Sequence, residues 1–181
     1  MATSQESKLQ LIQSRIRAFP DFPKKGILFR DICPIMKDPV ALTAVIDLFE
    51  EHVVKNHQQV DLIVGLDARG FLFGPLLAQR LGVGFVLVRK KGKLPGATAS
   101  VAYDLEYGKA EAEIQEDAVA PGQKVVLIDD LLATGGTLYA ACELMRKQQA
   151  EVLGCMVVIE LKELKGSDKV KPHSLFSLVQ Y

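Results

Sequence analysis

Residues 125–137 combine acidic side chains, small side chains and hydroxyl groups in one short stretch. Four apolar residues, Val125 to Ile128, lead directly into Asp129 and Asp130, and the next seven residues read LLATGGT. Glycines lack a Cβ atom and so let backbone N–H groups wrap a phosphate, to which a helix N-terminus adds partial positive charge. Carboxylates so close to a phosphate need a separate partner, and sugar hydroxyls suit them as hydrogen-bond donors. The stretch therefore predicts a site for a sugar that carries a phosphate.

The alternative for this stretch is a plain strand, turn and helix with a threonine cap. That alternative places two acidic side chains against four apolar residues with no task for them, which is unfavourable. The patterns GxxxxGK[ST] of P-loop proteins and GxGxxG of dinucleotide-binding proteins do not occur in the sequence.

Two more polar segments follow apolar runs that are typical of buried strands. Asp67-Ala68-Arg69 follows residues 62–66, and a basic segment with Arg89, Lys90 and Lys93 follows residues 83–88. Ligands of open α/β sheets bind beyond the carboxyl ends of the strands, so we expect these segments to converge with residues 129–137. Their cations provide positive charge for an anionic ligand. The alternative for the basic segment is a turn that faces only water.

Apolar runs that alternate with helical segments predict an α/β fold with a mainly parallel sheet covered on both faces. We expect strands at 62–66, 83–88, 125–128, 152–161 and 175–179, and helices at 71–81 and 137–149. Residues 130–136 between them are expected to form a loop.

Three further segments complete the predicted organisation. The spacing of apolar residues from Leu9 to Phe19 predicts a helix, and Asp38-Pro39 is typical of the start of another. Residues 103–114 indicate two strands broken at Gly108. Residues 92–106 contain two glycines, a proline and no periodic apolar pattern, which predicts a lid loop without regular structure.

Composition restricts the class of protein. Among 181 residues, 22 Lys and Arg balance 22 Asp and Glu, so the net charge of zero gives no global attraction to nucleic acid or to an anionic membrane. No apolar run suits a signal peptide or a membrane span, which makes the cytoplasm the expected location. Three cysteines cannot all pair within the chain, and we expect thiols in a reducing compartment.

Several motifs resemble one enzyme family. The run VVLIDDLLATGGT resembles the phosphoribosyl-pyrophosphate motif of type I phosphoribosyltransferases. FPDFPKKGILFRDI, GLDARGFLFGP, VRKKGKLPG and LEYG are similar, in the same order, to segments of adenine phosphoribosyltransferases. The resemblance covers nearly the whole chain. It implies one domain over residues 1–181: an open, mainly parallel twisted sheet flanked by helices, a small N-terminal hood that binds the base near residues 1–35, and a flexible catalytic lid near residues 92–106.

The resemblance implies roles for the matching residues. Asp129 and Asp130 resemble the acids that hold the ribose 2′- and 3′-hydroxyls, and Asp67-Ala68-Arg69 resembles the pyrophosphate loop, where a non-proline cis peptide is usual. Glu106 resembles the group near the purine proton that is lost, and Tyr107 a shielding or positioning residue; each has the alternative of an ordinary strand residue. The residues that resemble the 5′-phosphate cradle are Ala133, Thr134, Gly135, Gly136 and Thr137.

The implied activity belongs to purine salvage. A 5-phosphoribosyl group passes from 5-phospho-α-D-ribose 1-diphosphate (PRPP) to adenine, which yields AMP and diphosphate. The implied cofactor is Mg²⁺, held mainly by substrate oxygens and through water by Asp129. The family implies a homodimer in the cytoplasm, with small-molecule substrates and neither nucleic acid nor a membrane as partner.

The choice of adenine is assigned to the segment with Leu28, Phe29 and Arg30, which matches the family's hood. Its backbone carbonyl and amide groups can match the N6 donor and the N1 acceptor of adenine, while an apolar side chain packs on the ring. One alternative is a 6-oxopurine enzyme in which Lys162 faces O6, although this lysine also suits a solvent-facing position. Another alternative is a regulator that keeps the PRPP pocket without turnover, which would need a basic face or an added DNA-binding domain.

Overall fold

The computed structural model describes residues 4–105 and 108–181, and the chain divides into two compact units between Glu51 and His52. The first unit contains α1 (Gln5–Ser14), the antiparallel pair β1 (Arg17–Pro20) and β2 (Leu28–Asp31), α2 (Cys33–Lys37) and most of α3 (Pro39–Asn56). Asp38 caps α3 as predicted, since its Oδ1 accepts hydrogen bonds from the N–H groups of Val40 and Ala41 at 2.9 and 3.3 Å.

The predicted N-terminal helix is too long. α1 begins after a capping box between Ser4 and Ser7 and ends at Ser14, whereas Phe19 lies in β1 opposite Phe29 of β2. The apolar spacing continues through this region, but pairing with β2 competes with the helix. Arg17 also binds Asp31 across the two strands, with 2.5 Å between its Nη2 and Oδ2. These partners lie far apart in the sequence, so local spacing did not reveal them.

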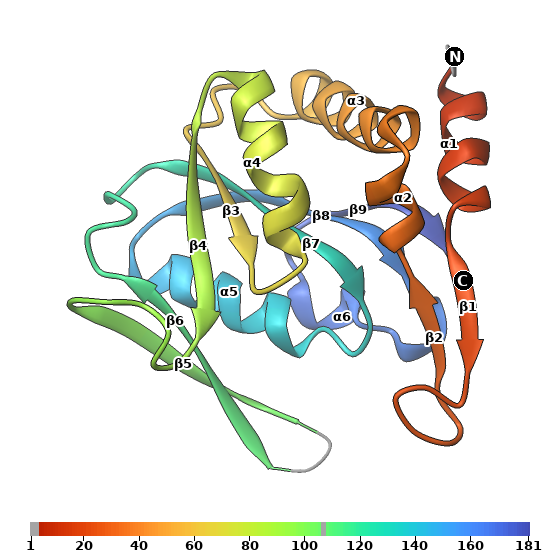
Figure 1. The fold of residues 1–181 in the computed structure, drawn as a ribbon. Coiled ribbons are helices and arrows are strands. Elements are labelled where there is room, and N and C mark those ends of the chain that lie inside the picture. Colours follow the sequence, from red (N-terminus) through yellow and green to blue (C-terminus); the bar gives the residue numbers. More distant parts are fainter. Residues whose placement is uncertain (1–3, 106–107) are drawn as a thin grey trace. The chain divides into compact units, whose positions relative to one another are not determined.

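The second unit is built on a seven-stranded sheet in the order β5-β6-β4-β3-β7-β8-β9 (Figure 1). Its strands are β3 (Leu62–Leu66), β4 (Gly84–Lys90), β5 (Thr98–Asp104), β6 (Lys109–Gln115), β7 (Lys124–Leu132), β8 (Glu151–Glu160) and β9 (Leu175–Gln180). The five strands from β4 to β9 in this order run parallel, and β6 is antiparallel to both β4 and β5. The predicted mainly parallel sheet is therefore confirmed.

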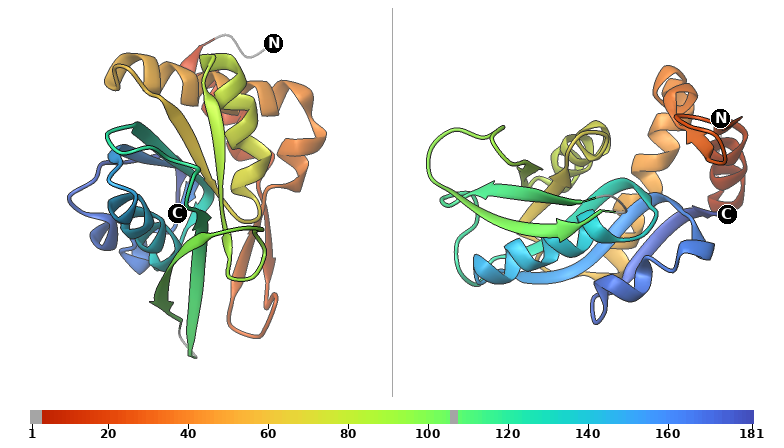
Figure 2. Two further views of the ribbon diagram at one scale, coloured as in Figure 1. Left: turned by 90° about the vertical axis from the view of Figure 1, so that its left-hand side faces the viewer. Right: turned by 90° about the horizontal axis from the view of Figure 1, so that it is seen from below.

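Helices cover both faces of this sheet. α4 (Gly70–Leu81) lies on one face, and α5 (Gly136–Lys147) lies on the other face beside the short α6 (Ser167–Val170), as Figure 2 shows. The central strand β7 is buried on both faces, since Val125 to Ile128 have no exposed surface. A strand of this kind reads as a continuous apolar run, which explains why its position was predictable.

Close packing of α4 depends on two glycines. A Cβ atom at Gly65 of β3 or Gly74 of α4 would lie 2.5 or 2.2 Å from ring atoms of Phe85 on β4. The bare backbones therefore leave the space that the Phe85 ring fills between helix and sheet. This packing determines the position of α4 on the sheet, and therefore the place where the first turn of α4 meets the end of β7.

The predicted lid is partly wrong. Residues 98–104 form β5 instead of an irregular loop, and they pair with β6 from Thr98 opposite Gln115 to Asp104 opposite Lys109. The antiparallel pair of β5 and β6, called the hairpin below, also contacts α5, where Lys147 Nζ donates to the carbonyl oxygen of Ser100 at 2.8 Å. Alternation of small polar residues does not distinguish a strand that packs on a helix from a loop.

Two smaller boundaries differ at the end of β7. The strand continues through both acids to Leu132, and α5 begins at Gly136, so the connecting loop is shorter than the predicted residues 130–136. The short helix α2 and the 3-10 turn η1 (Lys162–Leu164) were not predicted.

Candidate active site

The carboxyl ends of β3, β4 and β7 bring the predicted polar segments together. After β3, the N–H of Asp67 donates to the carbonyl oxygen of Val88 on β4 at 2.9 Å, and the Asp67–Ala68 peptide bond is cis, as the resemblance implies. α4 then starts at Gly70, whose Cβ position lies 2.8 Å from the carbonyl oxygen of Ile128. The absence of a side chain at Gly70 therefore lets the loop with Asp67, Ala68 and Arg69, which resembles a pyrophosphate-binding loop, lie against the end of β7.

The two acids of β7 have different environments, although both are buried. Oδ1 of Asp129 accepts the N–H of Asp130 at 2.8 Å. Burial, followed by the neighbouring charge of Asp130, raises the pKa of Asp129 well above its usual range. Asp130 has a cationic partner instead, since its Oδ2 accepts from Arg69 Nε at 2.5 Å. The chain therefore holds Asp129 toward its protonated form and pairs Asp130 with a guanidinium group.

The loop after β7 has the backbone shape of an anion cradle. Gly135 adopts a left-handed conformation with φ of 88°, and its carbonyl oxygen accepts the N–H of Tyr139 in the first turns of α5. A Cβ atom at Gly135 would lie 2.5 Å from the carbonyl oxygen of Gly166, and one at Gly166 would lie 2.4 Å from the carbonyl oxygen of Ala133. The cradle is thus shaped by two backbones in contact. Gly166 was missed by the sequence analysis, because a single glycine between lysine and serine carries no distinctive pattern.

These segments enclose a pocket of about 530 Å³. Its lining includes the acid pair, the cradle, the loop after β3 and one lysine of β4; the predicted residues among them are Asp67, Ala68, Arg69, Lys90, Asp129, Asp130, Ala133, Thr134, Gly135, Gly136 and Thr137. Asp104, Leu105, Leu131 and Leu132 also line it and were not predicted. The sites that the sequence analysis derived from three separate segments therefore form one cavity.

The basic turn, residues 91–94, is held by a buried carboxylate that the sequence analysis missed. Oε1 of Glu113 on β6 accepts the N–H groups of Gly92, Lys93 and Leu94 at 3.1, 3.0 and 2.8 Å. Burial opposes the ionised form of Glu113, but these N–H groups outweigh it and lower the pKa of the carboxyl group. Nothing in the sequence links Glu113 to this turn, since the connection depends on strand pairing.

The predicted cations near this turn occupy different positions. Arg89 Nε donates to Asp67 Oδ2 at 3.2 Å, and Arg89 lines a smaller cavity of about 40 Å³ together with Lys90. Lys90 also lines the larger pocket. Lys93 does not appear among the described residues that line either cavity, and its carbonyl oxygen lies 3.5 Å from Arg89 Nη1. Its predicted contact with a ligand remains a prediction.

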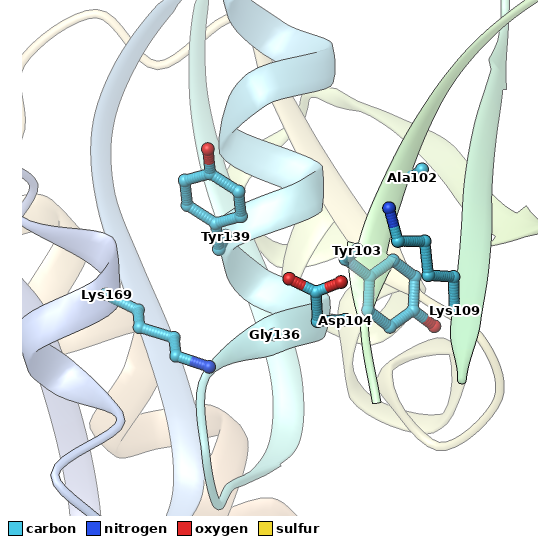
Figure 3. Close-up of a pocket in the computed structure, with 7 residues that line it drawn as sticks. All are labelled: Ala102, Tyr103, Asp104, Lys109, Gly136, Tyr139 and Lys169. Atoms are coloured by element: carbon cyan, nitrogen blue, oxygen red, sulfur yellow. The ribbon is translucent and has the colours of Figure 1, made fainter. Parts of the chain in front are cut away.

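A second pocket of about 460 Å³ adjoins the first and shares Asp104 and Gly136 with it (Figure 3). The hairpin, α5 and α6 form its walls, with Ala102, Tyr103, Asp104, Lys109, Gly136, Tyr139 and Lys169 as lining. In Figure 3 the Lys169 side chain extends toward Gly136. Burial, and then the charge of Asp67, raise the pKa of Tyr103. Because this pocket shares Gly136 with the cradle, it lies at the edge of the cradle.

The structure describes the predicted base-binding residues, but not the predicted residues at the end of the lid. Leu28, Phe29 and Arg30 belong to β2 of the first unit, where the Phe29 ring meets Phe22 edge-on at 5.1 Å between centroids. Glu106 and Tyr107 lie outside the described residues. The alternative residue Lys162 starts η1, and its N–H donates to the carbonyl oxygen of Tyr181 at 2.8 Å.

Known proteins share both the sequence and this fold. The family model for a phosphoribosyl transferase domain matches residues 35–180. Adenine phosphoribosyltransferase from Homo sapiens is 59% identical over 177 residues, which cover 97% of this chain and 98% of that protein. The protein from Rattus norvegicus is 60% identical over the same shares of both chains. The crystal structure of the Saccharomyces cerevisiae adenine phosphoribosyltransferase, complexed with an imino-altritol bisphosphate and adenine, has a TM-score of 0.93 and 43% identity and covers 96% of this chain and 99% of that one.

Proposed function

This chain belongs to the adenine phosphoribosyltransferase family, and from that membership we propose how its residues perform the transfer. It is a pentosyltransferase that moves the 5-phosphoribosyl group of PRPP onto adenine and yields AMP and diphosphate, a reaction of purine salvage. The observation that carries the proposal is the pocket of about 530 Å³ in which the acid pair, the glycine cradle and the loop after β3 meet.

The 5′-phosphate of the donor binds in the cradle. Backbone N–H groups from Ala133 to Thr137 and the start of α5 face an anion there, and the hydroxyl groups of Thr134 and Thr137 add donors. The left-handed Gly135 supports this role because it turns the backbone without a side chain in the pocket.

The ribose hydroxyls bind at Asp129 and Asp130 through an exchange of partners. Before the donor arrives, Asp130 is paired with Arg69. We propose that Asp130 then accepts a ribose hydroxyl while Arg69 turns to the diphosphate, so that each charged group replaces one partner with another. Burial raises the pKa of Asp129, and contact with a polar ligand favours the ionised form that accepts a ribose hydroxyl.

The leaving diphosphate is bound by the cations beside Asp67. Arg69, Arg89, Lys90 and Lys93 provide positive charge, which stabilises the transition state because the charge of the diphosphate increases as the C1′–O bond breaks. Glu113 supports this by holding the backbone of the basic turn in one shape.

Mg²⁺ fits the donor set of this pocket. Among the described residues, no group of three or more His, Cys, Asp and Glu side chains could hold a metal ion. Carboxylate oxygens are nevertheless suitable ligands, and Mg²⁺ commonly keeps water and substrate phosphates around it. We therefore propose that donor oxygens hold the ion and that Asp129 contacts it through water; when bound, it neutralises charge on the diphosphate.

The base is the other half of the proposed reaction. We propose that the two units act as one phosphoribosyltransferase domain, in which Leu28, Phe29 and Arg30 recognise adenine. Glu106 takes the purine proton and Tyr107 positions or shields the base. We propose that the lid near residues 92–106, which includes strand β5, covers C1′, because water would otherwise capture the oxocarbenium-like centre.

We also propose a cytoplasmic homodimer. Two leucines of the second unit support the dimer: Leu72 and Leu76, about one turn apart on α4, are about 40% exposed. Exposed apolar side chains that lie together are typical of an interface between proteins. No helix in the described part of the chain is long and apolar enough to cross a membrane. Neither nucleic acid nor a membrane is proposed as a partner.

A base-competition assay tests the proposed site and its alternatives. The protein is incubated with Mg²⁺, PRPP and equal amounts of adenine, hypoxanthine, guanine and uracil, and the nucleotides are separated by chromatography. We expect AMP as the main product. A faster reaction of hypoxanthine or guanine would favour the 6-oxopurine alternative with Lys162, and PRPP binding without any nucleotide product would favour the regulator.

A further inference from the structure

Two buried thiols of the second unit lie in contact with each other. Sγ of Cys142 on α5 is 3.9 Å from Sγ of Cys155 on β8, and the two residues are only 7% and 1% exposed. We propose that Cys142 and Cys155 are a redox modification site, which hydrogen peroxide converts into a disulfide that weakens binding of the phosphoribosyl donor.

The pair connects two elements that shape the donor pocket. Cys142 lies six residues after Gly136, where α5 and the cradle begin. Cys155 lies beside Leu127 of β7, two residues before Asp129 in the same strand. A movement of α5 against β8 at this point therefore changes the position of the cradle relative to the acid pair.

A disulfide requires such a movement. The sulfur atoms must approach from 3.9 Å to about 2.05 Å. The cradle has little space to absorb the shift, because a Cβ atom at Gly135 or Gly166 would already overlap with the opposing backbone. We expect the cradle to lose part of its fit to the 5′-phosphate. This consequence rests on the proposed function, whereas formation of the disulfide does not.

The two thiols have different parts in the reaction. Cys142 is the more exposed of the two thiols, at 7% against 1%, and the contact with Cys142 together with burial raises the pKa of Cys155. The Cys142 thiolate attacks one oxygen of the peroxide, which gives a sulfenic acid at Cys142 and hydroxide that takes a proton to become water. The Cys155 sulfur then attacks the sulfenic sulfur, and a second water leaves. In total, two thiols are oxidised and one peroxide is reduced to two waters.

Cys33 provides an internal comparison. It is the exposed cysteine and belongs to α2 of the first unit. Exposure alone would make Cys33 react first, whereas the proposal predicts that only Cys142 and Cys155 form a bond within one chain. The substitution Cys33→Ser removes links between molecules and touches no residue assigned to the reaction.

Peptide mapping tests formation of the disulfide. The folded Cys33→Ser protein is treated with hydrogen peroxide, alkylated, digested and analysed by mass spectrometry. We expect a linked peptide pair that contains Cys142 and Cys155 and that disappears after dithiothreitol. In Cys155→Ser we expect a dimedone adduct at Cys142, and in Cys142→Ser none at Cys155. If both thiols remain alkylatable in the folded protein, or if Cys155 takes the dimedone, the proposal is wrong.

Steady-state kinetics test the effect on the donor. We expect the oxidised Cys33→Ser protein to have a PRPP KM at least threefold higher than the reduced protein, with the adenine KM unchanged, and dithiothreitol to restore it. Cys33→Ser/Cys142→Ser, treated in the same way, serves as the matched control and should not respond. A disulfide that forms without change in the PRPP KM overturns the regulatory part. A reduced protein that makes no AMP contradicts the proposed function instead, and leaves the peptide result unaffected.

Discussion

The cradle, residues 133–137, lines the pocket of about 530 Å³, and the basic turn, residues 91–94, directly follows Lys90 of the same pocket, but the two obtain their shapes in different ways. The cradle follows directly after the acids of β7, and its glycines and threonines are adjacent in the sequence. The basic turn depends on Glu113, about twenty residues further along, which accepts three of its N–H groups. The difference indicates that chemistry encoded in one segment can be recognised from the sequence, whereas a shape that depends on strand pairing cannot.

The largest expected effect comes from adding a methyl group to the cradle. Gly135→Ala places a Cβ atom 2.5 Å from the carbonyl oxygen of Gly166 and keeps a residue at φ of 88°. Left-handed strain and overlap together amount to about 3 kcal/mol, and we expect a PRPP KM roughly 100-fold higher in steady-state assays. Gly122→Ala is the matched control, because Gly122 has φ of 83° with nothing within 4 Å of its Cβ position. An equal change in KM for both variants would show that strain alone is responsible.

The second effect separates activity from stability at the acid pair. The folded chain raises the pKa of Asp129, so the folded state binds a proton more tightly than the unfolded state and loses stability as the pH rises from the unfolded pKa toward the folded one. Asp129→Asn removes this loss. We expect AMP formation to fall by roughly tenfold or more, while Tm at pH 8 rises by a few degrees. Thermal denaturation from pH 4 to pH 8 checks this, and the gain in Tm should shrink toward pH 4. A wild-type protein that is more stable than the variant at pH 8 would contradict the assignment.

A smaller effect is expected at the basic turn. Glu113→Gln keeps one acceptor oxygen but removes the charge that three N–H groups bind, so we expect a PRPP KM about three- to tenfold higher. Glu111→Gln, two residues earlier on the same strand, is the matched control, because Glu111 forms an exposed pair with Lys91. Should Glu113→Gln exceed Gly135→Ala in its effect on KM, the basic turn would be the more important of the two regions.

The smallest effect concerns the contact between Arg69 and Asp130. Arg69→Gln releases Asp130 from its cationic partner, so we expect ribose 5-phosphate, which has no diphosphate, to bind about twofold more tightly. PRPP should bind more weakly because its diphosphate loses a cation. Isothermal titration calorimetry with both ligands measures these opposite changes. Weaker binding of both ligands would mean that Arg69 supports the pocket in a way other than the proposed exchange.

The sequence was most informative where a function depends on neighbouring residues. The buried strand β7, the acid pair and the cradle were all predicted, and the pocket brings them together. Local periodicity failed for residues 17–20 and 98–104, because each forms a strand only with a partner elsewhere in the chain. The supporting residues Glu113 and Gly166 were missed for the same physical reason. Glu113 acts through its carboxylate across paired strands, and Gly166 acts through the close approach of two backbones; no short sequence pattern records either.

The contact between Gly135 and Gly166 has a consequence for moving this loop into other proteins. Residues 129–137 look like a self-contained motif, yet the backbone at Gly135 packs directly against the backbone of Gly166, about thirty positions away. A graft of the loop alone onto another parallel sheet would meet whichever side chain that host presents at the corresponding place. The unit that can be transplanted is therefore a pair of segments. In a host protein without a glycine opposite the loop, the grafted residues would keep the sequence of the motif but not its backbone conformation.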